Sequence, residues 1–170
     1  MYTKVNARCV SMIGVLVALE IVLSRFTIHT WNLKIGFCFV PVVVAAIFYG
    51  PVAAGLVGAI GDVLSAVLFP VGVFFPGFTL TAFLTGVVFG ALLKKRQTLP
   101  NVLLSVGIVQ LVLSQGLNTF FISLFYGSPF ASLFFTRIYQ TLIMSAVQVA
   151  GIVLISKKLI PMLRRYEDMR

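Results

Sequence analysis

Charged residues are scarce in this chain: only 10% of its 170 residues are Asp, Glu, Lys or Arg. A soluble domain normally carries about 25% charged residues, whereas 60% of this chain is hydrophobic. These proportions exclude an ordinary soluble domain and indicate an integral membrane protein. The length allows one compact membrane domain over residues 1–170, with no separate soluble module.

Residues that carry catalytic chemistry are also few: 4 acidic residues, 1 histidine and 2 cysteines. The single histidine, His29, belongs to no Ser-His-Asp set, metal cluster or phosphate loop. We therefore expect no enzyme activity, no cofactor and no ATP hydrolysis by this chain alone. Cys9 and Cys38 form no CxxC pair and no disulfide framework, and we interpret both as small buried hydrophobic residues.

Basic residues outnumber acidic ones by 13 to 4, which gives a formal net charge of +9. Most of them lie at the ends of apolar segments, where topology signals are found, so we expect no nucleic-acid binding. The basic N-terminal residues precede an apolar run without a clear cleavage site. This pattern favours a retained first helix over a signal peptide.

The apolar runs predict an all-α membrane bundle of six transmembrane helices. The breaks between runs contain Tyr49-Gly50-Pro51, Phe75-Pro76-Gly77 and Tyr126-Gly127-Ser128-Pro129, which are typical of turns. The second helix is short and contains Pro41. The predicted helices cover residues 9–26, 35–48, 52–69, 78–93, 102–125 and 131–156.

The distribution of Lys and Arg predicts that both termini are cytoplasmic, because basic residues concentrate on that side of a membrane. The outer side then holds only Arg25, Lys34 and Arg137, which the topology rule does not require there. The predicted inner side holds Lys4, Arg8, Lys94, Lys95, Arg96, Lys157, Lys158, Arg164, Arg165 and Arg170.

Polar residues from four predicted helices fall at similar depths in the outer half of the membrane, given a rise of about 1.5 Å per residue. Ionisable groups inside a membrane usually face a bundle interior or a ligand cavity, so this band predicts a pocket. Aromatic residues on the same side are candidates for its mouth. The candidates for the band are Glu20, Asp62, Gln115, Asn118, Thr119, Arg137, Gln140 and Thr141, and for the mouth Phe26, Trp31, Phe74, Phe75, Phe78 and Tyr126.

Two simpler interpretations remain open for these residues. Gln110, Ser114 and Gln148 are equally well explained as hydrogen-bond partners between helices. Asp62 and Arg137 are also candidates for a structural ion pair.

A third feature lies apart from the band: Gly14 and Ala18 give the first helix a surface of small residues at which another membrane protein can dock. Similar pairs in the third and fourth helices favour internal packing.

Three short motifs resemble the folate-specific substrate-binding component, or S component, of energy-coupling factor (ECF) vitamin transporters. They are FPGFTLTAFLTGVVFG at residues 75–90, LSRF at residues 23–26 and Gly61-Asp62. The six-helix size extends the resemblance over nearly the whole chain. It implies a bacterial cell-membrane protein that captures folate outside and delivers it through a membrane coupling subunit driven by two cytoplasmic ATPases. In that family, small residues on the first helix dock the coupling subunit, a role that Gly14 and Ala18 match.

Folate chemistry suggests how the candidate residues divide. The pterin suits a carboxylate, Asp62 or Glu20, while Gln115, Asn118 and Gln140 complete its polar edge. Its flat rings suit stacking on aromatic side chains: Phe26, Trp31, Phe74 and Phe75. The dianionic glutamate tail suits basic residues near water: Arg25, Lys34 and Arg137. The alternatives are an S component for another vitamin such as riboflavin, and a membrane channel or scaffold without a vitamin ligand.

Overall fold

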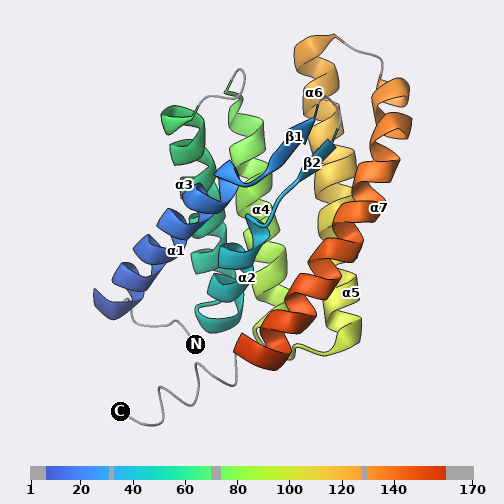
Figure 1. Cartoon of the computed structure of the whole chain (residues 1–170). Helices are drawn as coiled ribbons and strands as arrows, with labels where there is room; N and C mark the ends of the chain where they lie inside the picture. The colour runs from blue at the N-terminus through green and yellow to red at the C-terminus, as the bar shows by residue number, and fades with distance from the viewer. Residues whose placement is uncertain (1–6, 31–32, 70–73, 128–129, 160–170) are drawn as a thin grey trace.

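The computed structural model describes residues 7–30, 33–69, 74–127 and 130–159. Its helices form a bundle crossed by one small β-hairpin (Figure 1). The elements are α1 (Ala7–Arg25), β1 (Ile28–Thr30), β2 (Leu33–Ile35), α2 (Phe39–Phe48), α3 (Pro51–Leu68), α4 (Pro76–Leu93), α5 (Leu99–Gly107), the π-helix η1 (Ile108–Asn118), α6 (Thr119–Tyr126), α7 (Phe130–Leu154) and the π-helix η2 (Ile155–Leu159).

The described residues contain a helix at each of the six predicted positions. The fifth predicted helix corresponds to α5, η1 and α6, which form one continuous stretch, and the sixth corresponds to α7, which η2 continues. Four of these stretches are long and apolar enough to cross a membrane: Pro51–Leu68, Pro76–Leu93, Leu99–Leu124 and Phe130–Lys158. Helix α2 is apolar but shorter, at 10 residues. The prediction of a helical membrane fold is therefore confirmed.

The hairpin between α1 and α2 departs from the all-α prediction. Strands β1 and β2 pair antiparallel, with Ile28 opposite Ile35 and His29 opposite Lys34. The predicted start of the second helix at Ile35 is wrong, because Ile35 belongs to β2 and α2 begins at Phe39. Three-residue strands are too short to produce a clear alternating pattern in the sequence.

The predicted breakers end and start helices through their backbone preferences. Gly50 has φ 97°, a left-handed conformation that favours glycine, and Pro51 begins α3. Pro76 begins α4 in the same way, since proline lacks the N–H that a first helical residue leaves unpaired. Gly127, with φ 64°, ends α6. Turn chemistry therefore explains why helix positions were predicted well.

Close backbone packing joins α3 to α4. A side chain on Gly86 would meet the backbone of Ala54 and Gly55, and one on Gly90 would meet Gly50 and Pro51. The internal-packing interpretation is thus confirmed for these glycines. Without the hydrophobic effect between helices in lipid, such close van der Waals contact is a main source of helix association. Gly14, by contrast, has no atom within 4 Å of where a side chain would begin, so this part of α1 is an open surface.

The helices form two groups (Figure 1). In one group α3 packs on α1, α2 and α4, and in the other α7 packs on α5, η1 and α6. Helix α4 contacts η1, and α2 and β2 contact α7, so these elements join the groups. The first helix begins and the last helix ends at the same end of the molecule (Figure 1).

Replacing Gly86 by alanine is expected to lower the free energy of unfolding by about 1–3 kcal/mol, the usual cost of overpacking. The added methyl group has backbone rather than a movable side chain against it. Thermal unfolding in detergent measures the effect. Gly107→Ala is the matched control, because no atom lies within 4 Å of its added carbon. Equal melting temperatures for the two variants would contradict this view of the α3–α4 contact.

Candidate functional site

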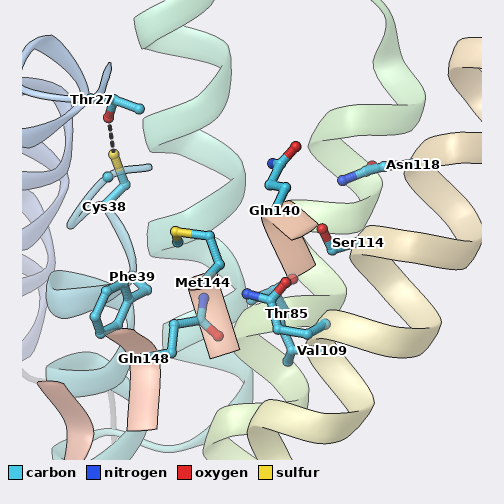
Figure 2. Close-up of a pocket in the computed structure, with 12 residues that line it drawn as sticks. Thr27, Cys38, Phe39, Thr85, Val109, Ser114, Asn118, Gln140, Met144 and Gln148 are labelled. Carbon is cyan, nitrogen blue, oxygen red and sulfur yellow. Dashed lines mark hydrogen bonds between the residues drawn. The ribbon is translucent and has the colours of Figure 1, made fainter. Parts of the chain in front are cut away.

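A cavity of about 190 Å³ opens between η1 and α7 (Figure 2). The segment from the end of α1 to the start of α2 forms one wall, and α4 contributes Thr85. Its lining mixes amides, hydroxyls, sulfur and apolar groups. The lining residues are Thr27, Gly36, Cys38, Phe39, Thr85, Val109, Gln110, Ser114, Asn118, Gln140, Met144 and Gln148.

Two rows of side chains, each spaced by four residues, make the two helical walls. Gln140, Met144 and Gln148 follow one another along α7. The chain runs in opposite directions in the two helices (Figure 1), so the second row faces the first in reverse order. The α7 row extends over about 12 Å at the α-helical rise. The second row consists of Gln110, Ser114 and Asn118 on η1.

Two buried oxygens in this lining have no hydrogen-bond partner among the described residues: Asn118 Oδ1 and Gln148 Oε1. Gln148 is only 5% exposed. A buried polar atom without a partner costs about 1–3 kcal/mol, and such atoms are uncommon in folded proteins. Both acceptors border the cavity, so they are positioned to receive hydrogen bonds from a molecule inside it.

The wall opposite the amide rows contains Cys38, which shares a hydrogen bond of 3.3 Å with Thr27 Oγ1 (Figure 2). The prediction that Cys38 is a buried hydrophobic residue needs correction, because its half-buried side chain lines the cavity. Phe39 is buried beside it, at 7% exposure. This wall adds a soft sulfur and a flat ring to the polar groups of the facing helices.

Among the predicted site residues, Asn118 and Gln140 line the cavity. Gln115 does not line the cavity, and both polar atoms of its amide form hydrogen bonds with α7. Its Nε2 donates to the Phe134 carbonyl at 2.6 Å, and its Oε1 accepts from Thr141 Oγ1 at 2.6 Å. The amide of Gln115 thus forms hydrogen bonds between helices. We had considered such bonds for Gln110, Ser114 and Gln148.

Arg137 and Asp62 have separate partners in the structure. Arg137 Nη1 lies 3.5 Å from Thr119 Oγ1, next in sequence to the cavity residue Asn118. Asp62 Oδ2 accepts a hydrogen bond of 2.7 Å from Thr79 on α4. The alternative of an ion pair between the two is therefore not supported.

The candidates on α1 lie against α3 and do not line this cavity. Glu20 is buried, at 8% exposure, and packs so closely on α3 that a side chain at Gly61 would overlap its carboxylate. The guanidinium of Arg25 lies 3.9 Å from the centre of the Phe69 ring. Such a contact attracts a cation to the face of an aromatic ring. Equal depth in the membrane did not bring these groups to the same cavity.

The aromatic candidates also divide. Phe75 packs against Phe78 and Phe121, with ring centres 5.8 and 5.3 Å apart. Phe26 and Phe74 are exposed, at 73% and 49%. None of these rings is part of the cavity lining. Lys34 lies in β2, and Trp31 lies outside the described residues.

Several lining residues were missed or explained in another way. Gln110, Ser114 and Gln148 were equally well explained as partners between helices, although each is spaced by four or eight residues from a predicted site residue on its own helix. That spacing was the available signal. Nothing in the sequence pointed to Thr27, Gly36 or Thr85, because the fold brings them from other elements.

A family model described as the ECF transporter substrate-specific component matches residues 9–157. The chain belongs to this family. As an ECF substrate-specific component it is a subunit of a membrane transporter, and its apolar helices agree with that location.

Two known folate transporters are similar to most of the chain. A folate transporter FolT from Clostridium novyi (strain NT) is 40% identical over 131 residues, which are 76% of each protein. A second, from Leuconostoc mesenteroides subsp. mesenteroides, is 32% identical over 155 residues, covering 87% of this chain and 84% of the relative.

Two solved structures share the fold. A crystal structure of FolT bound with folic acid has a TM-score of 0.84 and 34% identity, covering 90% of this chain and 95% of that one. The structure of an S component of a bacterial ECF transporter has a TM-score of 0.72 at 23% identity, covering 92% and 97%. The second likeness concerns the fold alone.

Gln148→Met is expected to leave the stability of the ligand-free S component unchanged or to raise it by about 1 kcal/mol, because it removes an acceptor without a partner. Gln115→Met is the matched comparison and is expected to lower stability by about 1–3 kcal/mol, because both atoms of that amide are hydrogen-bonded. Thermal unfolding of the two variants in detergent checks the difference. A larger loss for Gln148→Met would show that its amide is part of the packing.

Proposed function

We propose that this S component binds folate from outside a bacterial cell in the cavity between η1 and α7. The unpartnered oxygens of Asn118 and Gln148 on the cavity wall are the observation that carries the proposal. The FolT relatives, and the similarity to FolT bound with folic acid, support folate as the ligand.

The chemistry of the pterin matches an amide lining. A pterin edge presents both N–H donors and nitrogen or oxygen acceptors, and a side-chain amide offers one acceptor and two N–H donors. Asn118 Oδ1 and Gln148 Oε1 then accept from the ligand, and the amide of Gln140 also lines the cavity. In this proposal amides bind the pterin, and the carboxylates of Glu20 and Asp62 do not, because neither carboxylate lines the cavity.

The size of the cavity supports a particular orientation of folate. Pockets for drug-sized ligands usually measure about 300–1,000 Å³, whereas this cavity measures about 190 Å³. We infer that it receives the flat pterin and leaves the aminobenzoate and glutamate toward the mouth. Arg137 is a candidate for binding the tail, because it lies on α7 three residues before the cavity residue Gln140. Arg25 and Lys34 are further candidates for the tail.

The orientation proposed for the chain is six membrane spans with both termini in the cytoplasm. The shared end of α1 and α7 (Figure 1) supports it, and the exposed Lys94, Lys95, Lys157 and Lys158 suit the inner side. The open surface of Gly14 and Ala18 on α1 is then available to a membrane coupling subunit. Two cytoplasmic ATPases would supply the energy, and this chain would bind folate without catalysing a reaction.

Titration of the purified protein with folate by calorimetry tests the ligand, with riboflavin and thiamine as controls. Asn118→Leu is expected to weaken folate binding at least about tenfold, since each factor of ten corresponds to about 1.4 kcal/mol. The control Gln97→Leu alters an amide that donates to the Leu93 carbonyl at the end of α4, and should bind folate as the parent does. Tight binding of a control vitamin without binding of folate would refute the proposed ligand.

Comparison of folate with pteroate, which lacks the glutamate, tests whether basic residues at the mouth of the cavity bind the glutamate tail. Arg137→Gln is expected to weaken folate binding about tenfold and to change pteroate binding much less, because the lost charge faces only the anionic tail. Arg96→Gln is the control, an exposed arginine just after α4. If Arg137→Gln weakens both ligands equally, Arg137 does not recognise the tail.

A further inference from the structure

A group of polar contacts joins η1 to α7 beside the cavity. Gln115 is 3% exposed and Thr141 is 6% exposed, so both are removed from lipid and water. Thr141 Oγ1 donates to Gln115 Oε1 at 2.6 Å, and Gln115 Nε2 donates to the Phe134 carbonyl at 2.6 Å. One amide thus bonds to two places on α7, seven residues apart in sequence.

A weaker contact lies beside this amide. Arg137 Nη1 is 3.5 Å from Thr119 Oγ1, and Thr119 is fully buried. Thr141 Oγ1 also lies 3.1 Å from the Arg137 carbonyl. The Arg137–Thr119 contact therefore joins α7 to the start of α6, while the Thr141–Arg137 contact lies within α7.

Gln115 and Thr141 each come directly after a cavity residue in the sequence. Gln115 follows Ser114, and Thr141 follows Gln140. Because neighbours on one helix are rigidly connected, the Gln115–Thr141 bond determines which amides face one another across the cavity. A slide of one helix by a single residue is about 1.5 Å, whereas good hydrogen bonds vary by only a few tenths of an ångström.

The η1 segment needs such a contact more than an ordinary helix does. It is π-helical over 11 residues, a rare geometry that is often found at functional sites. Helices in lipid also lack a hydrophobic driving force toward one another. Beside van der Waals packing, polar contacts are therefore a means of specifying the alignment of η1 against α7.

We propose that Gln115 and Thr141 are positioning residues for ligand binding: they touch no ligand, and they hold the two amide rows at matching depths. This inference rests on the proposed folate-binding function. It assigns a part in affinity to two residues that do not line the cavity: Gln115, whose amide bonds to α7, and Thr141.

Three substitutions at the α7 side test the proposal by calorimetry with folate. Thr141→Val keeps the shape but removes the hydroxyl, and is expected to weaken folate binding about tenfold. Thr141→Ser restores the hydroxyl and should bind within about threefold of the parent. Thr136→Val is the matched control, because the hydroxyl of Thr136 is exposed and its hydrogen bonds among the described residues go to carbonyls of its own helix.

A second variant and a double substitution separate positioning from general stability. Gln115→Asn keeps the amide but shortens its reach, and is expected to weaken binding as Thr141→Val does, so the test does not depend on one variant folding. If Thr141 acts through the amide rows, Thr141→Val should weaken binding clearly less in an Asn118→Ala background than in the parent.

The outcomes are distinguishable. Parent-like folate affinity in both Thr141→Val and Gln115→Asn overturns the positioning role and leaves the proposed function intact. Strict additivity with Asn118→Ala, without recovery in Thr141→Ser, also overturns it, because the substitutions then act through stability alone. Failure of the unmodified protein to bind folate overturns the proposed function and this inference with it.

Discussion

The high cost of an unpaired polar group inside a membrane protein is the constraint on which this structure depends. The chain nevertheless buries several amides and hydroxyls in its apolar bundle. Some obtain partners on neighbouring helices, as Gln115 does from α7. Two amide oxygens, on Asn118 and Gln148, have none among the described residues, and both residues line the same cavity. Pairing thus holds helices together in one place, and in another the unpaired amide oxygens border the cavity in which we propose that folate binds.

The two halves of the bundle solve the packing problem differently. Helices α3 and α4 approach closely through glycine, with backbone against backbone. Helices η1 and α7 leave a cavity between them and meet through polar contacts. Tight packing in the first half gives a rigid support, while the polar contacts in the second half specify alignment without filling the space. A binding subunit needs both properties, because its site must be open and yet correctly shaped.

Helix positions could be predicted because proline and glycine mark the turns, as at Gly50-Pro51 and Pro76. The hairpin was missed because two strands of three residues leave almost no pattern. The site was only partly predictable for a geometric reason. Depth along a helix follows from sequence position, but the direction in which a side chain points into a bundle depends on packing. Glu20 and Asp62 have suitable depth and face other partners, whereas Gln140 and Asn118 reach the cavity.

A structure of the purified protein with folate bound would test the central claim most directly. The predicted result has the pterin between η1 and α7, with its N–H groups within hydrogen-bonding distance of Asn118 Oδ1 and Gln148 Oε1, and with the Gln115–Thr141 bond intact. A pterin bound instead between α1 and α3, against Glu20 or Asp62, would contradict the claim that unpartnered amides define the site.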